Sequence, residues 1–182
     1  IMMDKNITLL ARAENAQQYI VTMQTFSEFP DLWTGTSFDR LQKVSNVNPQ
    51  QSRYRWGTAR LIEYTDPVGI LRKARIYIPE DSNDSATRPL VVSLSDSGVD
   101  ALHVYPQPSP LKSADLGDSV SAFVSKGYVV LIPDIGSMIY HSVQSAMESI
   151  ISAVRQTIDS GIVDATRICL SGHSIGGTVV AY

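Results

Sequence analysis

The spacing of apolar residues divides the chain into a β-rich first part and a second part in which strands and helices alternate. In the first part, apolar and polar residues alternate in short runs. The runs lie at 7–14, 18–26, 32–38 and 40–44. They predict short strands joined by tight turns, as in a meander or a propeller blade. The polar stretch 46–52, which contains Asn48-Pro49, indicates a linker.

The second part begins with two strand-like runs, 59–64 and 71–78, around Asp66-Pro67-Val68-Gly69. This arrangement predicts a β-hairpin, because Asp, Pro and Gly favour turns. Compact apolar runs then predict three buried strands. They lie at 90–94, 128–132 and 168–170.

Apolar residues at helical spacing lie between these runs. The first predicted helix has Asp115 as its cap and stops at Gly127. The second covers 143–158 and stops at Gly161. The alternation predicts an α/β fold, a mostly parallel sheet with helices on both faces. A ligand site is expected at the carboxyl ends of its strands.

Composition excludes several function classes for this chain of 182 residues. A formal charge of −3 gives no reason to expect a nucleic-acid partner or an anionic membrane. No apolar run approaches the roughly 20 residues of a membrane span. The single cysteine, Cys169, lies in an apolar run, where we expect a buried, inert thiol. The histidines show no metal-ligand spacing, so we expect neither a metal nor a cofactor.

The candidate chemistry lies at Gly172-His173-Ser174-Ile175-Gly176-Gly177, directly after the last strand-like run. Gly-x-Ser-x-Gly between a strand and a helix is the pattern of a nucleophile elbow, in which the serine sits on a tight turn. Small flanking residues are needed because a Cβ at either glycine would crowd the backbone. Two alternatives are a turn that only packs and a phosphate site at a helix N-terminus. The phosphate alternative lacks a Walker-type Lys-Ser/Thr and Gly-x-Gly-x-x-Gly.

Several further segments bear on the family of this chain. Asp164-Ala165-Thr166-Arg167 precedes the strand and the Gly-x-Ser-x-Gly-Gly turn, and Gly161 ends the preceding helix. Three more segments lie upstream: Phe29-Pro30-Asp31-Leu32-Trp33, Asn48-Pro49-Gln50 and Trp56-Gly57. Together these segments resemble the prolyl oligopeptidase family of serine peptidases, at the join between its β-propeller and its hydrolase domain.

The resemblance implies two domains and a catalytic role. Residues 1–50 would be the C-terminal part of a β-propeller-like domain, and 51–182 the N-terminal part of an α/β-hydrolase domain. Ser174 matches the nucleophile, which forms an acyl-enzyme with a peptide substrate, and the N–H of Ile175 matches one oxyanion donor. The family's catalytic acid and His lie further along than this chain extends.

One segment departs from the family. After the run at 90–94 the family shows a glycine-rich turn, whereas this chain has Ser95-Asp96-Ser97-Gly98. In the family this turn helps to shape the oxyanion pocket. Tyr105 could supply a second donor, or it could be a loop aromatic packed against Pro106.

Other polar residues have structural interpretations. His173 occupies the variable position of the turn and points elsewhere than Ser174. We expect His103 and His141 to be surface or capping residues. Asp134 ends a strand and is expected to be a turn residue, because the acid of this fold follows the nucleophile.

Only about two helical turns follow Ser174, so we expect an internal fragment of a larger enzyme, inactive by itself. Two other functions stay open: an esterase on the same fold and a non-catalytic, hydrolase-like binding module. A periplasmic or secreted location is slightly favoured over a cytoplasmic one. The sequence does not indicate an oligomeric state.

Overall fold

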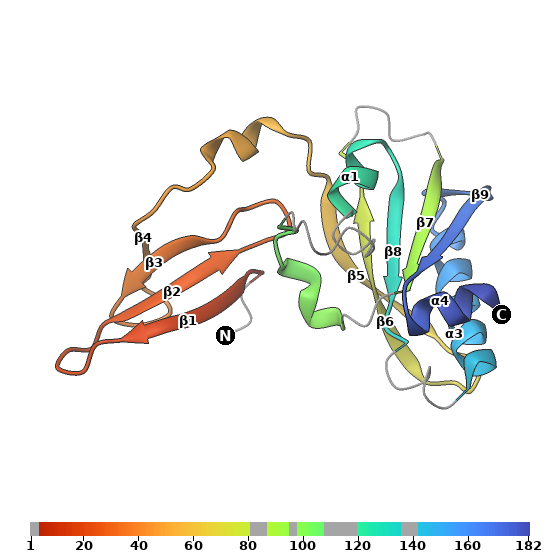
Figure 1. The fold of residues 1–182 in the computed structure, drawn as a ribbon, viewed down its shortest axis with the longest axis horizontal. Coiled ribbons are helices and arrows are strands. Elements are labelled where there is room, and N and C mark those ends of the chain that lie inside the picture. Colours follow the sequence, from red (N-terminus) through yellow and green to blue (C-terminus); the bar gives the residue numbers. More distant parts are fainter. Residues whose placement is uncertain (1–3, 81–86, 95–97, 108–119, 136–141) are drawn as a thin grey trace. The chain divides into compact units, whose positions relative to one another are not determined.

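The computed structural model describes residues 4–80, 87–94, 98–107, 120–135 and 142–182 (Figure 1). The chain divides into two compact units. The first comprises Ile1–Arg55 with His103–Tyr105, and the second comprises Trp56–Leu102 with Pro106–Tyr182. Three features of the sequence analysis lie outside the described residues: the helix cap Asp115, the histidine His141 and the segment Ser95-Asp96-Ser97.

The first unit contains a four-stranded antiparallel meander (Figure 1). Its strands follow one another in chain order: β1 (Asn6–Arg12), β2 (Tyr19–Gln24), β3 (Asp31–Gly35) and β4 (Gln42–Lys43). The expected linker contains a short 3-10 helix, η1 (Pro49–Arg53). Each predicted strand therefore forms, and each pairs with its neighbours in sequence.

Asp31, the first residue of β3, binds β4 and the residues that follow it through its carboxylate. Its carboxylate accepts hydrogen bonds from Lys43 Nζ at 2.6 Å, Ser45 Oγ at 2.6 Å and the Val47 N–H at 2.8 Å. Burial by itself would raise the pKa of Asp31, but the hydrogen bonds from Lys43, Ser45 and Val47 outweigh it and hold that pKa below its ordinary value. The side chain is 6% exposed, so these bonds replace its hydration.

Asp31→Ala should lower the free energy of unfolding of the first unit by about 1 to 3 kcal/mol, because its three donors lose their acceptor. A lowered folded pKa means that this contribution is present above the unfolded pKa of about 3.9 and is lost as pH falls through the folded pKa. Urea unfolding followed by Trp33 fluorescence at pH 7 and below pH 4 measures both effects. Asp39→Ala, at an exposed position, is the control; equal loss in both variants contradicts the prediction.

The second unit contains a five-stranded sheet in the order β5-β6-β8-β7-β9. The two pairs that involve β6 are antiparallel, and the two that involve β7 are parallel. The strands are β5 (Thr58–Thr65), β6 (Leu71–Ile78), β7 (Arg88–Leu94), β8 (Val129–Pro133) and β9 (Val163–Gly172). The sheet is therefore mixed: β6 alone runs against the direction that the other four strands share, because the predicted hairpin reverses the chain between β5 and β6.

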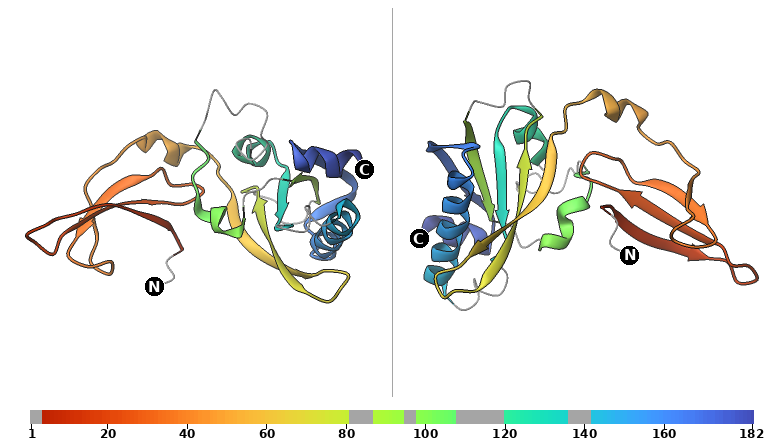
Figure 2. Two further views of the ribbon diagram at one scale, coloured as in Figure 1. Left: turned by 60° about the horizontal axis from the view of Figure 1, so that its bottom comes forward. Right: turned by 180° about the vertical axis from the view of Figure 1, so that it is seen from behind.

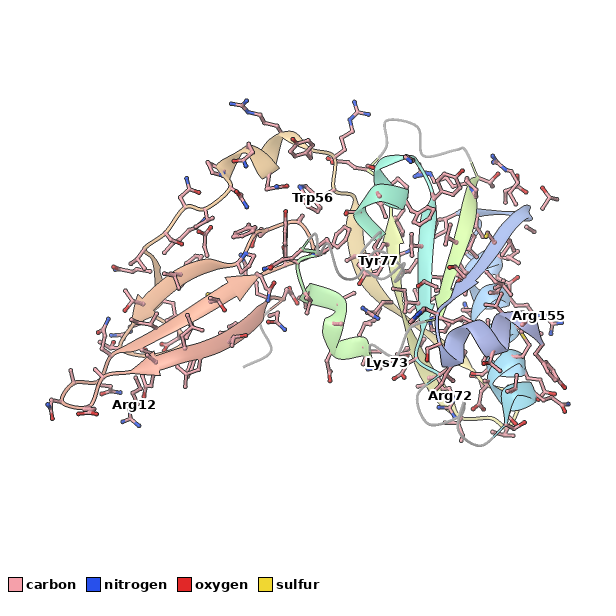
Figure 3. The ribbon with its side chains drawn as sticks, viewed as in Figure 1. Arg12, Trp56, Arg72, Lys73, Tyr77 and Arg155 are labelled. Carbon is pink, nitrogen blue, oxygen red and sulfur yellow. The ribbon has the colours of Figure 1, made fainter. Side chains whose placement is uncertain are left out.

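The hairpin turn is closed by Asp66, as its sequence indicates. The carboxylate accepts from the N–H groups of Val68 and Ile70 and from Arg72 Nε at 2.7 Å. Figure 3 labels Arg72 beside Lys73, the next residue of β6. Gly69 has a φ of 86°, which favours glycine. Burial would raise the pKa of Asp66, but the bonds from Arg72 and the two amides outweigh it and lower that pKa.

Helices cover both faces of this sheet among the described residues. Leu90, Val92 and Leu94 of β7 share one hydrophobic cluster with α3 (Val143–Asp159) and α4 (Ile175–Ala181). The alternate residue, Val91, is buried on the opposite face, because successive side chains of a strand point in opposite directions. On that face α1 (Val120–Ser125) packs beside β8 and β6 (Figure 2).

The position of Cys169 corrects the expectation of a buried thiol. Within the described residues β9 has one neighbour, β7, and forms an edge of the sheet. Ile168 and Leu170 pack against the hydrophobic cluster, whereas Cys169 points to the other face and is exposed. A run of three apolar residues thus buries only one of its faces, since the sheet is covered unevenly at its edge.

Candidate functional site

Ser174 lies between the last residue of β9, Gly172, and the first residue of α4, Ile175. Its backbone has φ 55° and ψ −122°, a conformation that favours glycine and is strained for any residue with a Cβ. The residue is exposed, and its carbonyl accepts the first helical hydrogen bond, from the Thr178 N–H at 3.2 Å. A strained, exposed serine therefore joins strand to helix, at the carboxyl end of β9.

Two glycines make this turn possible by allowing backbones to approach closely. A Cβ on Gly172 would lie 2.4 Å from the backbone C and O atoms of Gly176. A Cβ on Gly176 would lie 2.2 Å from the carbonyl oxygen of Leu94, at the end of β7. The expected crowding at both glycines of Gly-x-Ser-x-Gly is confirmed. Because Gly176 has no Cβ, the first turn of α4 can pack against the end of β7.

Upstream of the turn, the Asp-x-x-Arg segment forms a closed local structure. Asp164 accepts hydrogen bonds from the hydroxyl and the N–H of Thr166 and from Arg167 Nε at 2.7 Å. These bonds lower the pKa of Asp164 to about 2, the largest contributions coming from Thr166. Arg167 also donates to the carbonyl of Thr87 at 3.2 Å.

Among the described residues, no hydrogen bond joins the Ser174 hydroxyl to a histidine or a carboxylate. His173 is exposed beside it, and His103 ends the 3-10 helix η2 (Val99–His103). Asp134 follows β8, and its backbone contacts the two hairpin strands: its N–H donates to the Lys73 carbonyl, and its carbonyl accepts from the Tyr64 hydroxyl. The described residues also contain no cluster of side chains suited to a metal ion, and no helix among them is long and apolar enough to cross a membrane.

Tyr105 packs in the first unit. The residue is 5% exposed, and its ring meets that of Phe29 edge-on at 5.2 Å between centroids. Its N–H donates to Gln24 Oε1 at 3.0 Å. The aromatic partner of Tyr105 comes from the turn after β2, which sequence proximity does not reveal.

Comparison of the whole chain with solved structures finds peptidases that share its arrangement of strands and helices. The AtxE2 isopeptidase matches with a TM-score of 0.72 at 15% identity over 98% of this chain. The Pyrococcus horikoshii acylaminoacyl peptidase matches with a TM-score of 0.72 at 13% identity over 98% of this chain. Oligopeptidase B from Leishmania major matches with a TM-score of 0.62 at 13% identity over 99%. The chain shares their fold.

These neighbours are serine peptidases of the prolyl oligopeptidase family. The chain spans 29%, 28% and 26% of their respective lengths. No protein-family model matches the sequence, and no curated protein matches it. At these identities the likeness concerns the fold, so the roles of individual residues rest on the geometry of the site.

Proposed function

We propose that this chain is part of a serine peptidase of prolyl oligopeptidase type, with Ser174 as its nucleophile. The observation that carries the proposal is the backbone of Ser174, held at φ 55° on the turn between β9 and α4. Strain of this kind persists only where the surrounding structure imposes it, and it gathers at active sites. The likeness to peptidases in the fold, and the family motifs in the sequence, support the same function.

In this proposal the Ser174 hydroxyl attacks the carbonyl carbon of a peptide bond and forms an acyl-enzyme. The Ile175 N–H stabilises the oxyanion, because the first N–H groups of a helix have no acceptor within it. A histidine that accepts the serine proton, and an acid that orients it, would come from residues outside this chain.

A fluorophosphonate probe tests the proposal on the full-length protein that carries this chain. We expect one covalent adduct, which peptide mass spectrometry places on Ser174. A folded protein that stays unlabelled, or an adduct confined to another serine, would sink the proposal. Turnover of a short peptide amide and of an acyl ester with the same acyl group then distinguishes a peptidase from an esterase, because only a peptidase cleaves the amide at a comparable rate.

A further inference from the structure

Strand β9 contains an irregularity at the point where it joins β7. Val163 pairs with Arg88, and Ile168 pairs with Leu90. Residues 164–167 of β9 therefore have only Pro89 opposite them. Proline has no N–H to donate to a sheet ladder, so in strands it occurs at edges and bulges. The extra residues of β9 thus sit where β7 has no donor to offer.

Side-chain hydrogen bonds stabilise this excursion of β9, residues 164–167, and attach it to the start of β7. Asp164 holds Thr166 and Arg167 through the three hydrogen bonds described above, and Arg167 reaches the Thr87 carbonyl, just before β7. The Arg88 N–H donates to the Ile162 carbonyl at 3.2 Å, directly before the excursion. The length of the excursion is therefore set by contacts within it and to the start of β7.

The register that follows decides where Ser174 lies. From Leu90 opposite Ile168, the two strands run in step until Leu94 lies opposite Gly172. This pairing brings the turn to the Leu94 carbonyl, against which Gly176 packs. A slip of one residue would turn Ile168 and Leu170 away from the hydrophobic cluster and move the turn off Leu94.

We infer that Asp164 and Arg167 are positioning residues for Ser174, acting through the register of β9 on β7. The inference rests on the proposed function in taking Ser174 as the nucleophile. Arg167 is half exposed, and exposed ion pairs contribute little to stability. Loss of the Arg167 side chain should therefore affect the reactivity of Ser174 more than the melting temperature. Asp164→Ala also removes the acceptor of Thr166, so its labelling rate is compared per folded molecule.

The test compares Asp164→Ala and Arg167→Ala with two controls on the exposed face of α3, Asp159→Ala and Arg155→Ala, all in the full-length protein. The maximal rate of fluorophosphonate labelling should fall about ten- to a hundredfold in the first two variants, since small misplacements of a reacting group have effects of this size. The probe concentration at half-maximal rate should stay unchanged. Asp164→Asn, which keeps an oxygen acceptor for Thr166, should be intermediate.

Labelling rates per folded molecule that match those of the controls would overturn the inference, and so would a fall that only follows the loss of folded protein. If the wild-type protein is not labelled at all, the proposed function fails instead. Amide hydrogen exchange of residues 168–172 then still decides the inference about register. Faster exchange in Asp164→Ala than in Asp159→Ala supports it, and equal exchange overturns it.

Discussion

Replacing Ser174 with alanine should abolish fluorophosphonate labelling, and replacing it with glycine should abolish labelling while raising the melting temperature. Both changes remove the hydroxyl. Glycine alone relieves the backbone strain at φ 55°, which costs about 1 to 3 kcal/mol for a residue with a Cβ. Glycine also increases the conformational entropy of the unfolded chain, which lowers the free energy of unfolding by about 0.4 to 1 kcal/mol. The free energy of unfolding of Ser174→Gly should therefore exceed that of the wild type by about 1 kcal/mol.

Thermal unfolding of the three proteins, monitored by calorimetry beside the labelling assay, checks this result. Ser174→Ala keeps the Cβ and therefore the strain, so its melting temperature should lie close to that of the wild type. A Ser174→Gly variant less stable than Ser174→Ala would show that the turn is not strained. Stability and reactivity should thus change in opposite directions at one residue, as expected where an active site stores strain.

Gly176→Ala should destabilise the second unit by about 1 to 3 kcal/mol or more and should lower the labelling rate at Ser174 at least tenfold. The new Cβ would lie 2.2 Å from the Leu94 carbonyl oxygen, a backbone atom that cannot move without shifting β7. Helix α4 must therefore move away, taking the Ile175 N–H and Ser174 with it. Urea unfolding and probe kinetics on the same preparations measure the two effects.

Gly177→Ala is the matched control, because it adds the same atom to the next residue of the same helix. There the nearest contact of the new Cβ would be the Gly172 carbonyl oxygen at 3.4 Å, an ordinary van der Waals distance. Alanine also favours a helix over glycine by about 1 kcal/mol. Gly177→Ala should therefore be neutral or stabilising. If both variants lose similar amounts of stability and labelling rate, then any added Cβ in this helix is harmful, and the contact with Leu94 is not the cause.

The features predicted best from sequence are those that neighbouring residues determine. The hairpin around Asp66 and Gly69 and the long helix α3 follow from local turn chemistry and a regular apolar stripe, and both form as expected. The two glycines around Ser174 were also predicted, because a strand–turn–helix connection this tight has few solutions.

The features that the sequence did not predict depend on the order of the strands in the sheet and on contacts between distant segments. Cys169 was expected to be buried, but a run of apolar residues does not tell an edge strand from a central one. Tyr105 meets Phe29, a partner about 75 residues away that no local pattern indicates. The excursion of β9 has one sequence signal: Pro89 lies within the mostly apolar strand β7, where a proline marks a bulge or an edge.

The pairing of β7 with β9 also bears on the order of folding. The meander of the first unit pairs strands that are neighbours in the chain, so its contacts can form early. By contrast, β9 must find β7 across the whole of α1, β8 and α3, and such long-range contacts form slowly. We expect the strained turn at Ser174 to be completed last. A newly made chain would then carry an unreactive serine until its sheet is assembled.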